Sequence, residues 1–125
     1  MLQVIEFHYK KTKRPKLLEN NVFILYSPQK LKFEPGERKM VDMQLKIKFP
    51  ANITGNCTLL FHLANHGLHL ENSNYLTGET KLHFEILNRS MTRTIQIRSK
   101  SEIGYFTPDY VVGTEMKYKY VKERD

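Results

Sequence analysis

The chain contains almost no cysteine and no long apolar run. Cys57 is the only cysteine in 125 residues, so neither an intrachain disulfide nor a cysteine-based zinc cluster can form. No apolar run approaches the roughly 18 residues that a membrane-spanning helix requires. The opening residues, Met1 to Glu6, form a stretch that is too short and too soon charged for a secretory signal. These absences predict an intracellular protein that does not insert into a membrane and is not secreted through a signal peptide.

Size and charge set broad limits on the protein. A chain of 125 residues with 40% hydrophobic residues suits one domain with its own core, and oligomerisation would supplement so small a core. Lysine and arginine together number 20 against 13 acidic residues, which gives a net charge of +7. This balance favours association with nucleic acid, an anionic membrane or acidic proteins, although a merely soluble basic protein fits it equally well.

The dominant hydrophobic period is two. From residue 41 to 48, apolar Val41, Met43, Leu45 and Ile47 alternate strictly with polar side chains, and residues 82–87 and 93–98 alternate similarly. Turn signals separate these runs, and only residues 62–70 have room for a short helical turn. Short alternating runs at this spacing predict an all-β sandwich or barrel.

The C-terminal segment forms a further alternating run. Tyr118 and Tyr120 alternate with Lys117 and Lys119, which predicts a strand with one aromatic face and one basic face. Such a terminal strand often pairs with another subunit, so we expect the tyrosines to pack there and the lysines to face solvent. A frayed, solvated end is the alternative.

Several fragments between residues 2 and 108 recur in a familiar order. They are Leu25-Tyr26-Ser27, Pro35-Gly36-Glu37-Arg38, Leu63-Ala64-Asn65-His66-Gly67, Asn74-Tyr75 with Gly78-Glu79, and Ile95-Gln96-Ile97. In this order and spacing they resemble the trimeric dUTPases. The resemblance implies a jelly-roll-like, or β-clip, barrel that forms a homotrimer. Residues 1–109 would form the barrel, and residues 110–125 a C-terminal strand or arm exchanged between subunits.

The resemblance also assigns the positions of the family's chemistry. The acidic residue that holds the metal's hydration shell falls on Ile24, which offers no ligand. The arginine and serine that contact phosphate fall on Leu60 and Phe61, which carry no charge. The aspartate that activates water falls on Asn72, and an amide cannot accept a proton near neutral pH.

The last two motifs differ from the family as well. Where the family has a phosphate-binding glutamine the chain has Tyr105, and nearby Glu102 would repel phosphate. No glycine follows Gly113, so the glycine-rich arm that closes over the nucleotide is missing. The sequence therefore predicts no dUTPase activity, no cofactor and no metal. The residues shared with the family have the character of turn and core residues: Pro35, Gly36, Gly55, Leu63, Ala64, Gly67, Tyr75, Gly78 and Glu79.

Two hypotheses for function follow. Repurposed dUTPase folds of this kind occur in DNA viruses, so the first is a non-enzymatic viral protein that binds a protein partner, as a virion-associated or host-targeting module. The second is a nucleotide or nucleic-acid binding protein that uses a basic run and the tail: Lys10, Lys11, Lys13, Arg14, Lys16, Tyr118 and Tyr120. The run resembles a short nuclear-import signal, which would place the protein in a host nucleus, but a solvated loop explains it as well. Only Tyr9 adds an aromatic ring to the run itself.

Overall fold

Strands provide nearly all of the regular structure. The computed structural model describes residues 2–72, 76–109 and 113–124. The strands are β1 (Leu2–Tyr9), β2 (Lys16–Leu17), β3 (Phe23–Tyr26), β4 (Leu31–Phe33), β5 (Arg38–Lys48), β6 (Thr54–Leu59), β7 (Leu68–Leu70), β8 (Glu79–Asn88), β9 (Ile95–Ile97), β10 (Glu102–Asp109) and β11 (Glu115–Lys122). A 3-10 turn (Glu19–Asn21) and the helix α1 (Phe61–Asn65) complete the described elements. The all-β prediction is confirmed, and within the described ranges no helix has the length and apolar character to cross a bilayer.

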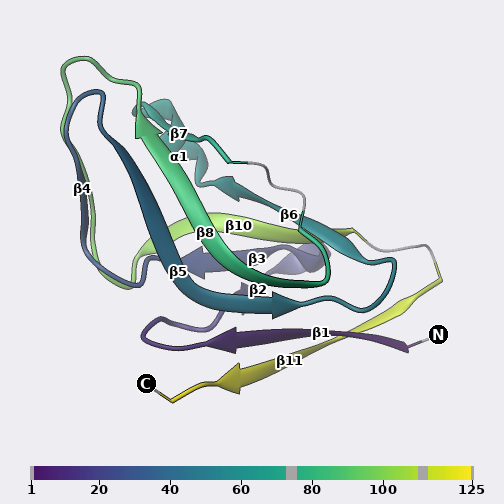
Figure 1. Ribbon diagram of the computed structural model, residues 1–125. Coiled ribbons are helices and arrows are strands. Elements are labelled where there is room, and N and C mark those ends of the chain that lie inside the picture. Colours follow the sequence, from purple (N-terminus) through teal and green to yellow (C-terminus); the bar gives the residue numbers. More distant parts are fainter. Residues whose placement is uncertain (1, 73–75, 110–112, 125) are drawn as a thin grey trace.

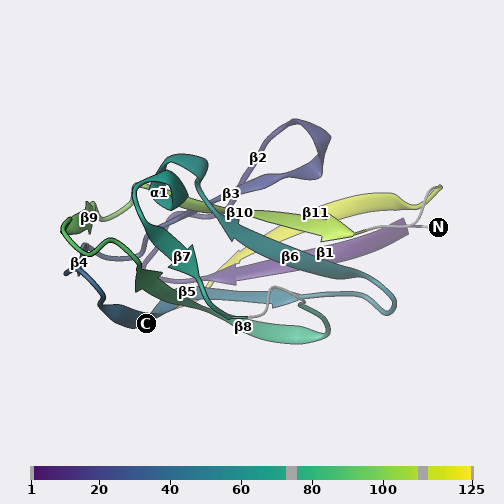
Figure 2. The same ribbon diagram turned by 90° about the horizontal axis from the view of Figure 1, so that it is seen from above.

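The strands form two larger sheets and one small one. One sheet has the order β11-β1-β5-β8-β7, the second β2-β3-β10-β6, and β4 pairs with β9. Figures 1 and 2 show the two larger sheets lying against each other, with the β4–β9 pair at one end. Strand β11 runs parallel to β1, whereas the other named pairings are antiparallel.

The core lies between the two larger sheets. As the alternation predicts, Val41, Met43, Leu45 and Ile47 of β5 are all buried, while Asp42 is exposed. Five phenylalanines are almost completely enclosed: Phe7, Phe23, Phe33, Phe84 and Phe106. Burial of one such side chain stabilises the fold by about 1.5–3 kcal/mol, so these rings anchor both sheets.

Some of the residues shared with the dUTPases have clear structural roles. Gly36 and Gly78 adopt positive φ angles of 75° and 66° in turns, a conformation that costs glycine little. Leu63 is buried, whereas Pro35, Ala64 and Glu79 are exposed. These three residues therefore do not belong to the core. Tyr75 lies outside the described residues.

The predicted C-terminal strand is present as β11. Its Tyr118 ring lies 4.7 Å from the Phe23 ring, and the Tyr118 hydroxyl donates a hydrogen bond to the Asn21 side chain at 3.0 Å. Tyr120 stacks on Phe7 with 5.5 Å between ring centroids. Lys117 and Lys119 are exposed, as expected, and β11 packs on β1 of its own chain. Exchange of residues 110–125 between subunits remains a prediction.

Candidate functional site

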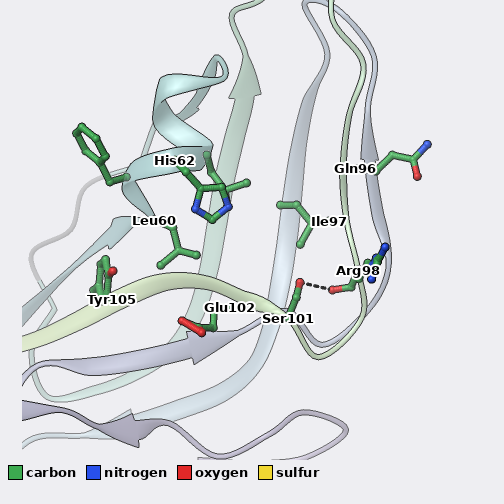
Figure 3. A pocket seen from close by; sticks show the side chains of 10 residues that line it. Leu60, His62, Gln96, Ile97, Arg98, Ser101, Glu102 and Tyr105 are labelled. Carbon is green, nitrogen blue, oxygen red and sulfur yellow. Dashed lines mark hydrogen bonds between the residues drawn. The ribbon is translucent and has the colours of Figure 1, made fainter.

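Positions assigned to phosphate by the resemblance gather at one groove of about 560 Å³, which we call the motif groove. It is lined by Leu60, Phe61, His62, Leu63, Gln96, Ile97, Arg98, Ser101, Glu102 and Tyr105. Figure 3 shows Leu60 and His62 on one side and Gln96, Ile97 and Arg98 on the other, with Ser101, Glu102 and Tyr105 along the start of β10. Elements distant in the sequence therefore converge where the resemblance places phosphate.

The start of α1 forms one side of the motif groove. The backbone N–H of Leu60 donates to the carbonyl of Ile103 at 3.0 Å, which ties the helix start to β10. Leu60 and Leu63 are buried beneath the helix, whereas Phe61 is 75% exposed. Because the two leucines anchor the helix, Phe61 and His62 remain on its outer side.

A tight turn before β10 positions the polar residues of the motif groove. The Ser101 hydroxyl donates to the carbonyl of Arg98 at 2.6 Å. The backbone N–H of Lys100 donates to the Ser27 carbonyl at 2.8 Å, and the N–H of Ser27 donates to the Ser101 carbonyl at 2.8 Å. Ser27 is completely buried, so the end of the Leu25-Tyr26-Ser27 fragment fixes the turn that presents Glu102.

Asn88 supports the side of the motif groove that β9 forms, opposite α1. Its side-chain Nδ2 lies 3.2 Å from the Phe33 carbonyl, 3.2 Å from the Glu34 carbonyl and 2.8 Å from the Arg93 carbonyl. Its Oδ1 accepts a hydrogen bond from the N–H of Ser90 at 3.0 Å. Asn88 is completely buried, so its polar atoms need partners within the protein. The bonds that satisfy them join β8 to the segments that bear β4 and β9.

Ile24 and Asn72 do not line the motif groove. Ile24 lies on β3 opposite Tyr105 of β10 and is only 8% exposed. Its neighbours Phe23 and Leu25 belong to the hydrophobic core cluster, so Ile24 lies on the other face of β3. The Asn72 amide donates to the His83 carbonyl at 2.8 Å, and its oxygen accepts from the N–H of Glu85 at 3.1 Å. A carboxylate could accept but could not donate, so this pair of bonds requires an amide.

The described side chains near the motif groove provide little catalytic machinery. Within the described ranges, no three His, Cys, Asp or Glu side chains are grouped so as to hold a metal ion. Burial raises the pKa of the Cys57 thiol to about 12, which leaves this cysteine unreactive near neutral pH. Arg98 and Glu102 give the groove charges of both signs, with His62 beside them.

A second groove, of about 670 Å³, lies between the 12–17 segment and the end of β11, and we call it the basic groove. Its lining residues are Tyr9, Thr12, Lys13, Arg14, Pro15, Lys16, Leu17, Tyr26, Tyr120 and Lys122. The Lys13 ammonium lies 4.2 Å from the centre of the Tyr26 ring, and the Arg14 guanidinium lies 4.7 Å from that of Tyr120. The structure thus unites part of the basic run with Tyr120, while Lys10, Lys11 and Tyr118 do not line this groove.

The fold gives the basic run an aromatic neighbour, Tyr26, that does not lie near it in the sequence. Strand β2 pairs with β3 so that Lys16 lies opposite Ile24, and this antiparallel register brings Lys13 to Tyr26. The short spacing between residues 16–17 and 23–24 is a hairpin signal that could have revealed this neighbour. Burial raises the pKa of the Tyr26 and Tyr120 hydroxyls, so both rings stay neutral beside the cations.

Comparisons with known proteins identify the fold. No protein-family model matches the chain, and no curated protein matches it significantly. The Staphylococcus bacteriophage 80alpha dUTPase with dUPNHPP superimposes with a TM-score of 0.75 at 13% identity, covering 90% of this chain and 86% of that chain. A mutant dUTPase from phage phi11 of S. aureus gives a TM-score of 0.71 at 13% identity, covering 86% and 89%. The chain therefore has the dUTPase-like all-β fold, as the resemblance implied.

Proposed function

We propose that this chain is a non-enzymatic viral protein of the dUTPase fold that binds a protein partner at the motif groove and assembles as a homotrimer. The observation that carries the proposal is Asn72. The sequence resemblance assigns this residue to the position where the family activates water, and its amide is engaged by two backbone groups of β8. It cannot act as a general base, and its hydrogen bonds give the amide a structural role.

The phosphate positions support the absence of hydrolysis. Leu60 is buried under α1, and the exposed Phe61 ring offers no hydrogen-bond donor to a phosphate. Glu102 adds a negative charge to the same groove, which repels a triphosphate. Of the described lining residues, only Arg98 brings a permanent positive charge.

The exposed Phe61 supports a protein partner. A phenylalanine that is 75% exposed at the mouth of a groove can bury its ring in a partner, and aromatic anchors often dominate binding energy. Arg98 and Glu102 line the same groove and bring charges of both signs to it, which suits a polar rim. Phage dUTPases of this fold are described as controlling the transfer of virulence genes by a proto-oncogenic G protein-like mechanism. A regulatory role and a viral source for the present chain are in keeping with them.

Trimer formation is supported by exposed apolar side chains on several elements. Leu2 and Val4 of β1, Leu17 of β2 and Met40 of β5 are 38–62% exposed. Light scattering at micromolar concentration should give about three times the 14.8 kDa chain mass. A monomer at that concentration would contradict the proposed assembly.

The absence of hydrolysis is tested with dUTP and magnesium. The wild-type protein should release pyrophosphate at background rate, and Asn72→Asp should not restore activity because the phosphate positions remain apolar. Asn72→Asp should also destabilise the fold by about 1–2 kcal/mol, because its carboxylate cannot donate to the His83 carbonyl. The control Asn65→Asp changes an exposed residue of α1 and should leave Tm nearly unchanged. Wild-type turnover near one per second would refute the proposal.

The partner site is tested by comparing two exposed apolar residues. Phe61→Ser should lose at least about tenfold of the affinity for a partner captured from a cell lysate and then purified. Met91→Ser removes an 83% exposed side chain outside the motif groove and should keep that affinity. Full retention of binding by Phe61→Ser would place the interaction elsewhere.

A further inference from the structure

The basic groove is formed by parts of the chain that only the fold brings together. Because β1 and β11 run parallel, the loop after β1 and the end of β11 lie at the same end of the molecule (Figure 1). Tyr26 enters from β3, which pairs with β2. The groove therefore lies on folded strands. Its lining shares no residue with that of the motif groove, although Tyr26 lies opposite Glu102 in the β3–β10 pairing.

The groove is cationic without compensation. Among the residues that the structure describes, Lys13, Arg14, Lys16 and Lys122 line it and no acidic residue does. Within residues 2–72, 76–109 and 113–124, none of these four cations has a carboxylate partner. Some cations elsewhere are paired, as Lys46 is with Glu79 and Glu123 and Arg38 is with Glu71 and Glu85. A cluster of like charges without neutralising partners raises the local concentration of anions.

The tyrosines give the cations fixed positions. Lys13 and Arg14 each lie over a ring, at 4.2 Å and 4.7 Å from the ring centres. Such contacts restrict long side chains before a ligand arrives, so less conformational entropy is lost when a phosphate binds. The planar guanidinium of Arg14 keeps edge N–H groups for phosphate while its face lies on Tyr120.

The combination of rings and cations distinguishes among anions. A phosphate backbone needs only positive charge, but an unpaired base also stacks on aromatic and guanidinium planes. The bases of a duplex are already stacked and cannot use the rings, and an acidic peptide gains nothing from them. We infer that the basic groove binds single-stranded nucleic acid, with Lys13, Arg14, Lys16 and Lys122 on the phosphates. A base would stack on the outer face of the Arg14 guanidinium, whose inner face lies on Tyr120, with Tyr26 beside it.

The binding test uses the full chain and a fluorescently labelled oligothymidylate of about 20 nucleotides, followed by anisotropy. With four phosphate contacts, a plot of the logarithm of the binding constant against the logarithm of the salt concentration should have a slope of about −3. The double variant Lys13→Gln/Arg14→Gln should bind at least about tenfold more weakly at low salt and should have a slope of about −1.5. Both residues are exposed, so the fold should be retained, which circular dichroism checks.

A matched control separates this groove from general charge. Lys30→Gln/Arg89→Gln removes the same two charges from exposed positions outside the groove and should weaken binding less than about twofold. Tyr120→Leu keeps an apolar side chain on Phe7 but removes the ring, and it should weaken binding about five- to tenfold with an unchanged salt slope.

Three results would overturn the inference. Equal weakening in the groove variant and the matched control would show that net charge alone attracts the strand. A duplex of the same sequence that binds as tightly would show that the groove does not stack an unpaired base. Competition by polyglutamate at the same charge concentration, as effective as unlabelled oligothymidylate, would assign the groove to an acidic protein.

Discussion

The two grooves of this molecule differ in what builds them and in the charge they carry. The motif groove is bordered by α1, β9 and β10, and its lining includes both Arg98 and Glu102. The basic groove lies between the loop after β1 and the end of β11, and its described charged residues are all cations. Internal hydrogen bonds of Ser27 and Asn88 support the first, whereas cation–π contacts order the second.

This difference separates the role of the scaffold from that of binding. The residues around the motif groove are tied into the fold, so many substitutions there should lower the free energy of unfolding. Lys13, Arg14 and Lys16 of the basic groove are exposed and make no described contact with a carboxylate, so substitutions there should change binding and leave stability nearly unaltered.

The largest expected effect comes from truncation after Gly113, which removes β11. The truncated chain loses the eight-residue pairing with β1 and the tyrosine rings that cover Phe7 and Phe23. Several kcal/mol of stability should be lost, with a fall in Tm of about 10 °C or more. Thermal unfolding followed by circular dichroism measures the fall, and light scattering tests whether an oligomer dissociates.

Removal of residues 124 and 125 alone is the control for that truncation. It leaves β11 intact and should keep Tm within about 2 °C. If truncation after Gly113 gave the same Tm and particle size as the full chain, β11 would be a free arm, and the basic groove would lack the folded strands described above.

The fold could be predicted from the sequence because its signals are local. Alternation at Val41, Met43, Leu45 and Ile47 fixes which face of β5 is buried, and the same rule identified β11. The order of the short fragments added the dUTPase-like topology, which no alternation pattern specifies. The partner of β11 was not predictable, because the backbone groups at a strand edge can pair equally with a strand of the same chain or of another.

The candidate sites were only partly predictable for a related reason. Ile24, Leu60 and Phe61 were all assigned to one site, yet Leu60 and Phe61 line the motif groove and Ile24 does not. The double hydrogen bond of Asn72 depends on β8 backbone groups more than ten residues away. Tyr26 reaches the basic run through strand register, which sequence spacing only suggests. Contacts between distant segments decide these roles.

A smaller effect is expected from Asn88→Ala, which breaks the support of the motif groove. The substitution removes donors for the carbonyls of Phe33, Glu34 and Arg93 and an acceptor for the N–H of Ser90. Loss of this buried network should lower stability by about 3 kcal/mol. Chemical denaturation measures the change, and oligothymidylate binding below the transition should persist because the basic groove lies elsewhere. A loss below about 1 kcal/mol would show that Asn88 does not support this side of the motif groove.

The smallest expected effect concerns a paired cation, for contrast with the unpaired ones. Lys46 of β5 lies 3.2 Å from the Glu79 carboxylate, and its hydrogen bond and charge lower the pKa of Glu79 below 4.5. A carboxyl whose pKa is lower in the folded state stabilises the fold above its ordinary pKa, and this contribution is lost as the pH falls through the folded value. Glu79→Gln should therefore lower Tm slightly at pH 7, by about 1–2 °C because the pair is exposed, and should match wild type well below pH 4.5. Lys16→Gln should not lower Tm at either pH, since Lys16 has no described carboxylate partner to lose. Equal decreases in Tm for both variants would mean that paired and unpaired cations contribute alike, and the contrast between Lys46 and the unpaired cations of the basic groove would fail.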